Sequence, residues 1–230
     1  MTIPRFFFLI QVACAAALMA VSSTVAGEKE SAAVITFATE PGELYLPVAE
    51  VSRALRLPVL LNIAGQCIQI NGMEVAAGSL RCLNDGTELI GASGLVKAGV
   101  DARSLGRIFG AGAEPKRVEI NLGTQQIFAW QGSRLVLQSH ISSGRNGRTP
   151  AGDFRAGPFR ARMHYSTRYH NAPMPWSVQI NGHVFIHGFT SVPNYPASHG
   201  CIRLPLTGHN PARFFFEWVD NGTPVQITRD

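Results

Sequence analysis

The most informative segment of the second half of this chain is Ser198-His199-Gly200-Cys201-Ile202-Arg203-Leu204-Pro205. Gly200 and His199 next to Cys201 predict that this cysteine lies in a turn rich in glycine and histidine. Upstream, His183-Val-Phe-Ile-His187 is β-branched and aromatic, which predicts a strand, and Gly188 follows its last histidine. This part of the chain is therefore expected to be mainly β and to bring a cysteine and histidines together.

These residue types match the needs of a cysteine nucleophile. Such a nucleophile requires thiolate character and a base within hydrogen-bond reach. His187, at a strand end, can take the proton of the Cys201 thiol, and Gly188 leaves room for a backbone carbonyl that orients the imidazole.

Three further residues fit the same chemistry. His199 offers a second imidazole, and Arg203 offers positive charge. Gly200 permits a backbone conformation closed to other residues, so that amides around Gly200 and Cys201 can converge on an oxyanion.

At these residues the sequence resembles the L,D-transpeptidase catalytic domain, also called the YkuD domain. The resemblance rests on His187-Gly188 and on the stretch Ser198 to Arg203, and it extends to Ser143-Gly144, to Thr149-Pro150-Ala151-Gly152 and to Phe154. It covers roughly residues 116 to 230 and implies a YkuD-like β-sandwich with short helices. It also implies roles for six residues: Cys201 as acyl-accepting nucleophile, His187 as base, Gly188 as the orienting carbonyl, Gly200 in the oxyanion turn, and His199 and Arg203 as supports.

The resemblance implies an enzyme, a peptidoglycan L,D-transpeptidase without a cofactor. The thiolate would attack the L,D bond after diaminopimelate in a tetrapeptide stem and release D-alanine, leaving a thioester. The acceptor stays open among a second stem, a lysine of a wall-attached protein, and water. Two alternatives remain: an L,D-carboxypeptidase or amidase-type hydrolase of the same fold, and a non-catalytic cell-wall-binding module.

The segment between Gly152 and His187 is expected to be a loop that shapes the substrate site. It contains Arg155, Arg160, Arg162 and Arg168, followed by Met174, Pro175 and Trp176. We expect Arg160 and Arg162 to hold stem carboxylates, with Ser198 and Trp176 also on the substrate side. A solvated, flexible lid is an equally good interpretation of the same residues.

A zinc site and a papain-like protease explain the pattern less well. His183 and His187 on a strand would lie roughly 13 Å apart, too far to share one ion. The papain-like class places its cysteine before its histidine, whereas His187 precedes Cys201 here. No metal site is therefore expected.

Periodic patterns predict further elements of the C-terminal half. Val118, Ile120 and Leu122 alternate with polar residues, residues 126–130 and 135–137 flank a turn, and residues 225–227 supply another strand. Asn210 can cap a helix with Pro211 in its first turn.

Upstream, the pattern predicts a small α+β module. Residues 44–48 and residues 89–92 each read as a strand passing into an amphipathic helix, and residues 68–72 read as a strand between them. The module resembles, over roughly residues 34 to 109, the stalk-type domain first named from copper amine oxidases, which implies a spacer or docking role. Gly110, Gly112 and Pro115 mark the boundary, giving expected domains at 27–112 and 113–230.

The first 26 residues have the pattern of a cleaved signal peptide. Arg5 precedes an apolar stretch, and Thr24-Val25-Ala26 is a small-residue cleavage site. We therefore expect export to the periplasm or cell envelope and no stable membrane anchor after cleavage. The net charge of +5 suits an anionic wall polymer, and the chain has no basic run with interleaved aromatics that would indicate nucleic acid.

An exported chain can keep disulfides. Cys67 and Cys82 lie close in sequence, and Cys201 is isolated from both, so we expect the first two to pair. Closing a loop of about 15 residues contributes roughly 3 kcal/mol in the chain-entropy model. Two free thiols are the alternative.

Overall fold

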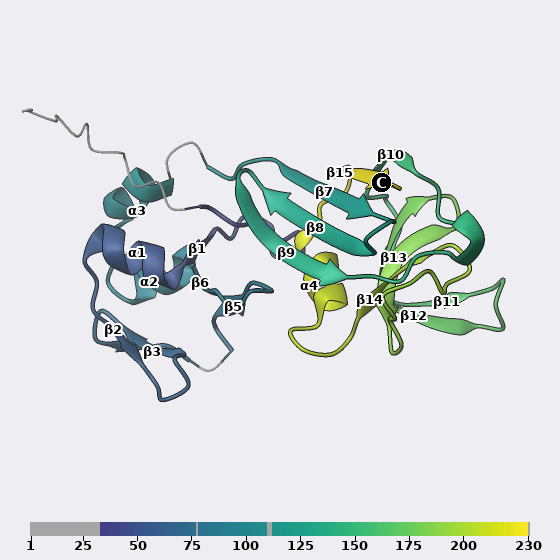
Figure 1. Ribbon diagram of the computed structural model, residues 1–230. Coiled ribbons are helices and arrows are strands. Elements are labelled where there is room, and N and C mark those ends of the chain that lie inside the picture. The colour runs from purple at the N-terminus through teal and green to yellow at the C-terminus, as the bar shows by residue number, and fades with distance from the viewer. Residues whose placement is uncertain (1–32, 77, 110–111, 230) are drawn as a thin grey trace, which may run out of the picture.

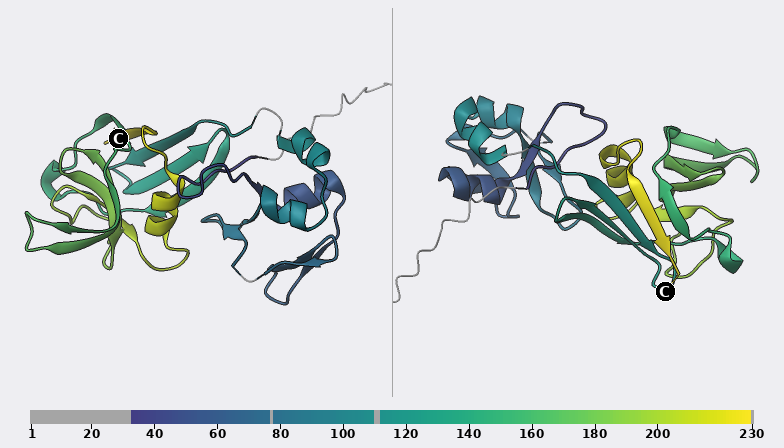
Figure 2. Two further views of the ribbon diagram at one scale, coloured as in Figure 1. Left: turned by 180° about the vertical axis from the view of Figure 1, so that it is seen from behind. Right: turned by 90° about the horizontal axis from the view of Figure 1, so that it is seen from above.

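The structure, a computed structural model, describes residues 33–76, 78–109 and 112–229. It consists of an N-terminal lobe and a C-terminal lobe that lie side by side (Figures 1 and 2). The expected signal segment and the expected cleavage site lie outside the described residues. Within the described part of the chain, no helix has the length and apolar character needed to cross a membrane.

The N-terminal lobe contains three short helices and two three-stranded sheets. One sheet has the order β1-β6-β5 and the other β2-β3-β4. Both predicted strand–helix units are present, and their strands β1 and β6 pair antiparallel. The bounds are β1 (Tyr45–Pro47), α1 (Val48–Leu55), β2 (Val59–Leu61), β3 (Cys67–Ile70), β4 (Met73–Glu74), β5 (Arg81–Cys82), β6 (Glu88–Gly91), α2 (Ala92–Lys97) and α3 (Ala102–Phe109).

The C-terminal lobe is a β-sandwich, as expected. Its two sheets have the orders β10-β15-β7-β8-β9 and β11-β12-β13-β14. One helix and one 3-10 turn accompany them, and α4 shares the sandwich core through Phe215 and Trp218. The bounds are β7 (Lys116–Asn121), β8 (Gln126–Gln131), β9 (Arg134–His140), η1 (Arg145–Gly147), β10 (Gly152–Arg155), β11 (Arg160–Ser166), β12 (Ala172–Asn181), β13 (Val184–Phe189), β14 (Ile202–Pro205), α4 (Pro211–Trp218) and β15 (Pro224–Thr228).

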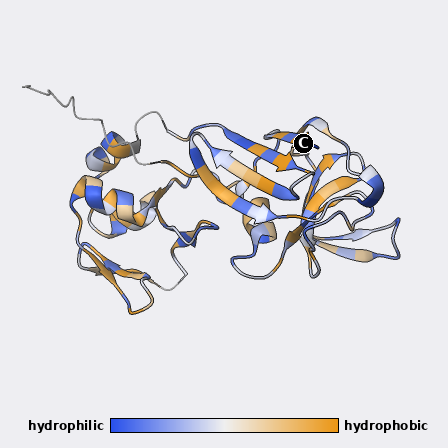
Figure 3. Cartoon of the chain, in the orientation of Figure 1, coloured by the Kyte–Doolittle hydropathy of each residue, from blue (hydrophilic) through white to orange (hydrophobic). Residues whose placement is uncertain are grey.

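Alternation along the strands explains this sandwich. In β7, Val118 and Ile120 are buried between more exposed residues, and Figure 3 shows apolar and polar residues alternating along this strand. Helix α4 begins as predicted, because the Asn210 side chain accepts a hydrogen bond from the Arg213 amide and Pro211 occupies its first turn.

The segment between Gly152 and His187 is not a loop, which corrects the sequence-based expectation. It forms β10, β11 and β12, and β11 pairs with β12 as an antiparallel hairpin. Strand β11 lies at the edge of its sheet, where it pairs only with β12, and most of its residues are polar. The alternation of apolar residues that indicates a strand is therefore missing from its sequence.

The expected disulfide is absent from this structure. Cys67 is buried, its thiol donating to the Gln69 carbonyl at 3.5 Å, whereas Cys82 is an exposed free thiol. The two cysteines nevertheless flank one side chain: the Cys67 amide donates to the Glu88 carboxylate, and Cys82 is paired with Glu88 across β5 and β6. Glu88 thus interacts with both residues, and the two sulfur atoms do not form a bond although the cysteines are close in sequence.

The two lobes share part of one hydrophobic core. Ile35, Phe37 and Tyr45 from the N-terminal lobe belong to the cluster that fills the sandwich, while a second cluster lies wholly within the N-terminal lobe. Arg81 joins the lobes as well, because its guanidinium pairs with Glu40 and, at 2.6 Å, with Glu217 of α4. The division into domains at residues 112 and 113 stays a prediction.

Replacing Arg81 by alanine is expected to lower the free energy of unfolding by about 2 kcal/mol. The substitution removes the shortest ion pair of Glu217, whose side chain is 12% exposed. Because solvent reaches part of this pair, the loss should be smaller than for a fully buried ion pair. Arg117→Ala breaks an exposed pair with Glu119 and should cost at most about 0.5 kcal/mol. Urea unfolding measures both variants, and equal losses would contradict the bridging role of Arg81.

Candidate active site

The candidate site lies where β13 and β14 run parallel. His187 is in register with Arg203, so the two side chains occupy one face of the sheet. Cys201 lies two positions before Arg203, directly ahead of β14, and it lines the same cavity as His187 and Arg203. One strand spacing and two residues of rise separate the Cα atoms of His187 and Cys201 by roughly 8 Å, which an imidazole and a thiol together can span.

The imidazole of His187 is held in a defined orientation. Its Nδ1 lies 2.8 Å from the carbonyl oxygen of Gly188 and donates to it, so Nε2 is the unprotonated nitrogen. His187 is buried, at 4% exposure. The structure thus contains the orienting carbonyl that was expected at Gly188.

Burial sets the charge state of His187. Desolvation lowers its pKa to about 4, the Gly188 hydrogen bond opposes this, and the charges of Arg203 and His164 lower it further. At neutral pH the imidazole is therefore an uncharged base.

Acid is expected to destabilise the fold through His187. Between pH 6.5 and 4 the imidazole of His187 is protonated in the unfolded chain but stays neutral in the folded chain. The free energy of unfolding therefore falls as the pH falls through this window. Lowering the pH from 7 to 5 should cost about 2 kcal/mol at this residue. Urea unfolding of wild type and His187→Gln at both pH values measures this, and an equal loss in both proteins would rule it out.

Cys201 is a partly buried thiol at the start of β14. Its Sγ lies 3.6 Å from the His183 carbonyl oxygen. Burial raises its pKa, while a backbone hydrogen bond with Phe185 and the charge of Arg203 act in the opposite direction. The resting site is therefore a neutral thiol beside a neutral imidazole.

A second segment holds the turn before Cys201 in place. The carbonyl of Ser143 accepts hydrogen bonds from the Ala197 and Ser198 amides, and the Thr149 hydroxyl bridges the Gly144 amide and the Gly200 carbonyl at 2.7 Å each. The segments Ser143-Gly144 and Thr149 to Gly152, which carried part of the resemblance, thus support the cysteine turn.

Gly200 and Ser198 shape this turn internally. Gly200 has φ +144°, a conformation that favours glycine. Its amide donates to the Ser198 hydroxyl, which in turn donates to the Cys201 carbonyl. The Gly200 amide is therefore not free to bind an oxyanion, a correction to the expectation. The Cys201 amide has no hydrogen-bond partner among residues 33–76, 78–109 and 112–229.

His199 lies on the exposed side of the turn. Its Nε2 accepts a hydrogen bond from Arg145 at 2.9 Å, and its ring stacks on Tyr169 with centroids 4.3 Å apart. Burial and then the charges of Arg145, Arg148 and Arg203 lower its pKa. Arg203 itself lies 4.0 Å above the ring of Phe189.

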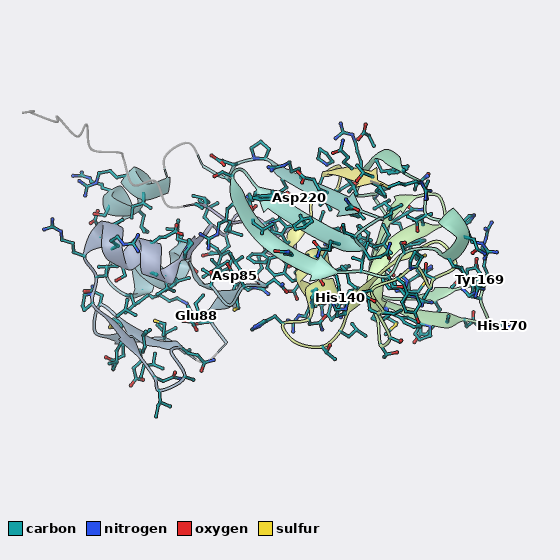
Figure 4. All side chains as sticks on the ribbon, in the orientation of Figure 1. Asp85, Glu88, His140, Tyr169, His170 and Asp220 are labelled. Atoms are coloured by element: carbon teal, nitrogen blue, oxygen red, sulfur yellow. The ribbon has the colours of Figure 1, made fainter. Side chains whose placement is uncertain are left out.

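A cavity of about 250 Å³ joins most of these residues. Tyr169, which lies with His170 at the end of the molecule farthest from Asp85 and Glu88 in Figure 4, lines it from the β11–β12 hairpin. The predicted residues on its wall are Cys201, His187, His199, Gly200, Arg203 and Ser198. Within the described parts of the chain, no group of three or more metal-ligating side chains is arranged to hold an ion.

Three predicted substrate residues lie outside this cavity, which corrects that part of the expectation. Arg160 donates to the Phe216 and Val219 carbonyls at the end of α4, so its guanidinium is committed to the fold. Trp176 packs against Phe216, with ring centroids 5.5 Å apart. Arg162 is exposed and does not line the cavity.

The structure adds cavity residues that the sequence analysis did not single out. His164 and Tyr169 come from the β11–β12 hairpin, and Arg148 comes from the turn before Thr149. Recognising residues 167–171 as the turn of a hairpin would have pointed to the first two.

Comparison with known proteins agrees with the resemblance. The family model of the L,D-transpeptidase catalytic domain, YkuD, matches residues 115–227. A search of curated proteins gave no match.

Solved structures of L,D-transpeptidases are among the similar chains. That from Stackebrandtia nassauensis has 21% identity and a TM-score of 0.45, with 51% of this chain and 57% of that chain covered. That from Xylanimonas cellulosilytica has 23% identity and a TM-score of 0.43, with 84% of this chain and 96% of that chain covered. One from Mycobacterium tuberculosis has 18% identity and a TM-score of 0.45, with 51% of this chain and 59% of that chain covered.

The chain thus spans little more than half the length of the first of these structures. Its own residues nevertheless match the family's catalytic-domain model from one end of the sandwich to the other. Residues 115–227 belong to the YkuD family of L,D-transpeptidase catalytic domains.

Proposed function

We propose that this protein is a peptidoglycan L,D-transpeptidase that acts through a thioester on Cys201. The observation that carries the proposal is the fixed imidazole of His187. Its Nδ1 donates to the Gly188 carbonyl, which leaves Nε2 as a neutral base, and His187 and Cys201 line the same cavity.

The neutral resting pair defines the first step. As Sγ of Cys201 attacks the carbonyl carbon of the L,D bond, its proton passes to Nε2 of His187. Arg203, on the same face, stabilises the negative charge that develops on sulfur, in keeping with its effect on the pKa of the thiol. The step requires no thiolate in the resting enzyme.

The amide of Cys201 is the proposed donor to the oxyanion. The neighbouring Gly200 amide is occupied by Ser198, whereas the Cys201 amide is unpaired within the described chain. A preorganised backbone donor contributes several kcal/mol to such a transition state, about 3 kcal/mol in a typical case. The Thr149 bridge to Gly200 keeps the amide in place.

Collapse of the intermediate completes the first half-reaction. Protonated His187 returns its proton to the amine of D-alanine, which leaves, and the acyl group remains on Cys201 as a thioester. The same nitrogen then accepts a proton from the incoming acceptor amine. The acceptor, whether a second stem or a wall-attached protein, enters the cavity from which D-alanine departs.

Mass spectrometry of the products tests this function. The chain from Gly27 onward is incubated with disaccharide-tetrapeptide, and Cys201→Ala is incubated in parallel. Release of D-alanine with a joined dimer is the expected result. Release with only a tripeptide product would mean a hydrolase, and no reaction would favour the binding module.

We also propose that the protein acts in the cell envelope. The motivation is the signal-peptide pattern of residues 1–26. Sequencing the N-terminus of protein recovered from the envelope should return Gly27. A retained Met1 would contradict cleavage.

A further inference from the structure

The cavity of the candidate site is bordered by positive charge. Arg148, Arg168 and Arg203 line it, and Arg145 lies beside them, donating to His199. The four arginines come from three separate segments: the turn after Gly144, the turn of the β11–β12 hairpin, and strand β14. Only the fold brings them to one place.

No acidic side chain balances these charges. The cavity wall contains neither aspartate nor glutamate. Ion pairs in the described part of the chain involve other cations, namely Arg81, Lys116, Arg117, Arg134 and Arg213. Gathering like charges without a counter-charge is unfavourable, and an anionic ligand relieves it.

Arg148 and Arg168 line the same cavity as His199. Tyr169 stacks on His199, which joins the hairpin turn to the cysteine turn. Arg168 precedes Tyr169 directly, and Arg148 influences His199 electrostatically. His199 is itself a neutral acceptor for Arg145, so the positive charge here comes from the arginines.

We propose that Arg148 and Arg168 form a carboxylate subsite that selects acyl donors with a free carboxylate beside the scissile bond. This inference rests on the proposed function. A guanidinium binds a carboxylate through two parallel hydrogen bonds, and an amide of the same shape lacks the charge that makes these bonds strong. Two carboxylates of a tetrapeptide stem qualify: that of the terminal D-alanine and that of the diaminopimelate side chain.

Matched donors test the subsite. Three stems are compared: one with both carboxylates free, one amidated on D-alanine, and one amidated on diaminopimelate. In wild type, amidation of the recognised group should raise KM about tenfold and change kcat little, which also identifies the carboxylate. In Arg148→Gln or Arg168→Gln, KM for the free stem should rise similarly and the preference should vanish. Arg117→Gln, which removes an exposed charge elsewhere, is the control. Unchanged preference in both cavity variants would overturn the proposal.

A second measurement needs no peptidoglycan. Iodoacetate and iodoacetamide alkylate the same thiolate with loss of iodide, and they differ in one carboxylate, so their rate ratio reports local charge independently of thiol pKa. Cys82, which is exposed beside Asp85 and Glu88, is an internal reference. At low salt the iodoacetate-to-iodoacetamide ratio at Cys201 should exceed that at Cys82 about tenfold, and it should fall about threefold in each cavity variant.

The two measurements separate the two proposals. A high ratio at Cys201 without D-alanine release from any stem would support the cationic subsite and contradict the transpeptidase function. Release of D-alanine together with equal ratios at Cys201 and Cys82 would support the transpeptidase function and contradict the cationic subsite.

Discussion

Replacing Cys201 by alanine is expected to lower the rate of D-alanine release by roughly four to six orders of magnitude, to the background of the assay. The variant loses the proposed nucleophile, and among the described residues no other cysteine lines the cavity. His187→Ala should be nearly as damaging, because the thiol then has no base. The double variant should be no slower than Cys201→Ala, since the two residues act as one unit. Steady-state assays with the tetrapeptide stem measure all three.

Two matched variants act as controls for these losses. Cys82→Ala removes an exposed thiol of the N-terminal lobe, and His140→Ala removes an imidazole of β9 that lies outside the cavity (Figure 4). Both should retain wild-type rates. A Cys201→Ala enzyme that still releases D-alanine at a comparable rate would refute the nucleophile.

Replacing Gly144 by alanine is expected to lower kcat about 100-fold although residue 144 does not line the cavity. A Cβ atom there would lie 2.8 Å from the Cα of Gly200 and 2.8 Å from the amide nitrogen of Thr149. Both are backbone atoms that cannot rotate away, so the turn that carries Cys201 must shift. The same clash should lower the free energy of unfolding by about 1–3 kcal/mol.

Gly106→Ala is the control for this substitution. A Cβ at Gly106, inside α3, meets no atom within 4 Å, so turnover should stay at the wild-type value and the free energy of unfolding should rise by about 0.5–1 kcal/mol, because alanine favours a helix interior. The Gly144 variant is followed by kcat for D-alanine release and by thermal unfolding. Wild-type turnover in Gly144→Ala would show that the cysteine turn does not depend on this close approach.

The motif residues were predictable because each carries its chemistry in its type and spacing. His187-Gly188 and the segment from Ser198 to Arg203 are each local in sequence, whereas the parallel pairing of β13 with β14 that brings them together is a finding of the structure. Strand β7 was predictable from its two-residue period, and β8 and β9 were predictable from the turn that they flank. The α4 helix was predictable from Asn210 and Pro211 at its start.

The remaining features depend on long-range packing. Strand β11 has too few apolar residues on one face to show a period, and Pro173 and Pro175 at the start of β12 argue against a strand, so the sequence predicts a loop here. Arg160 turns to the end of α4, and that direction is set by a helix far along the chain. Likewise, Glu88 lies between Cys67 and Cys82, which no local pattern reveals.

A thioester on Cys201 would add mass to the intact protein during turnover, and mass spectrometry detects it. The enzyme is quenched in acid shortly after mixing with tetrapeptide stem and is then digested and mapped. We expect an added mass equal to the stem without its D-alanine on the peptide that contains Cys201, and no added mass in Cys201→Ala. Release of D-alanine with no adduct on that peptide, or with the adduct on another residue, would contradict it.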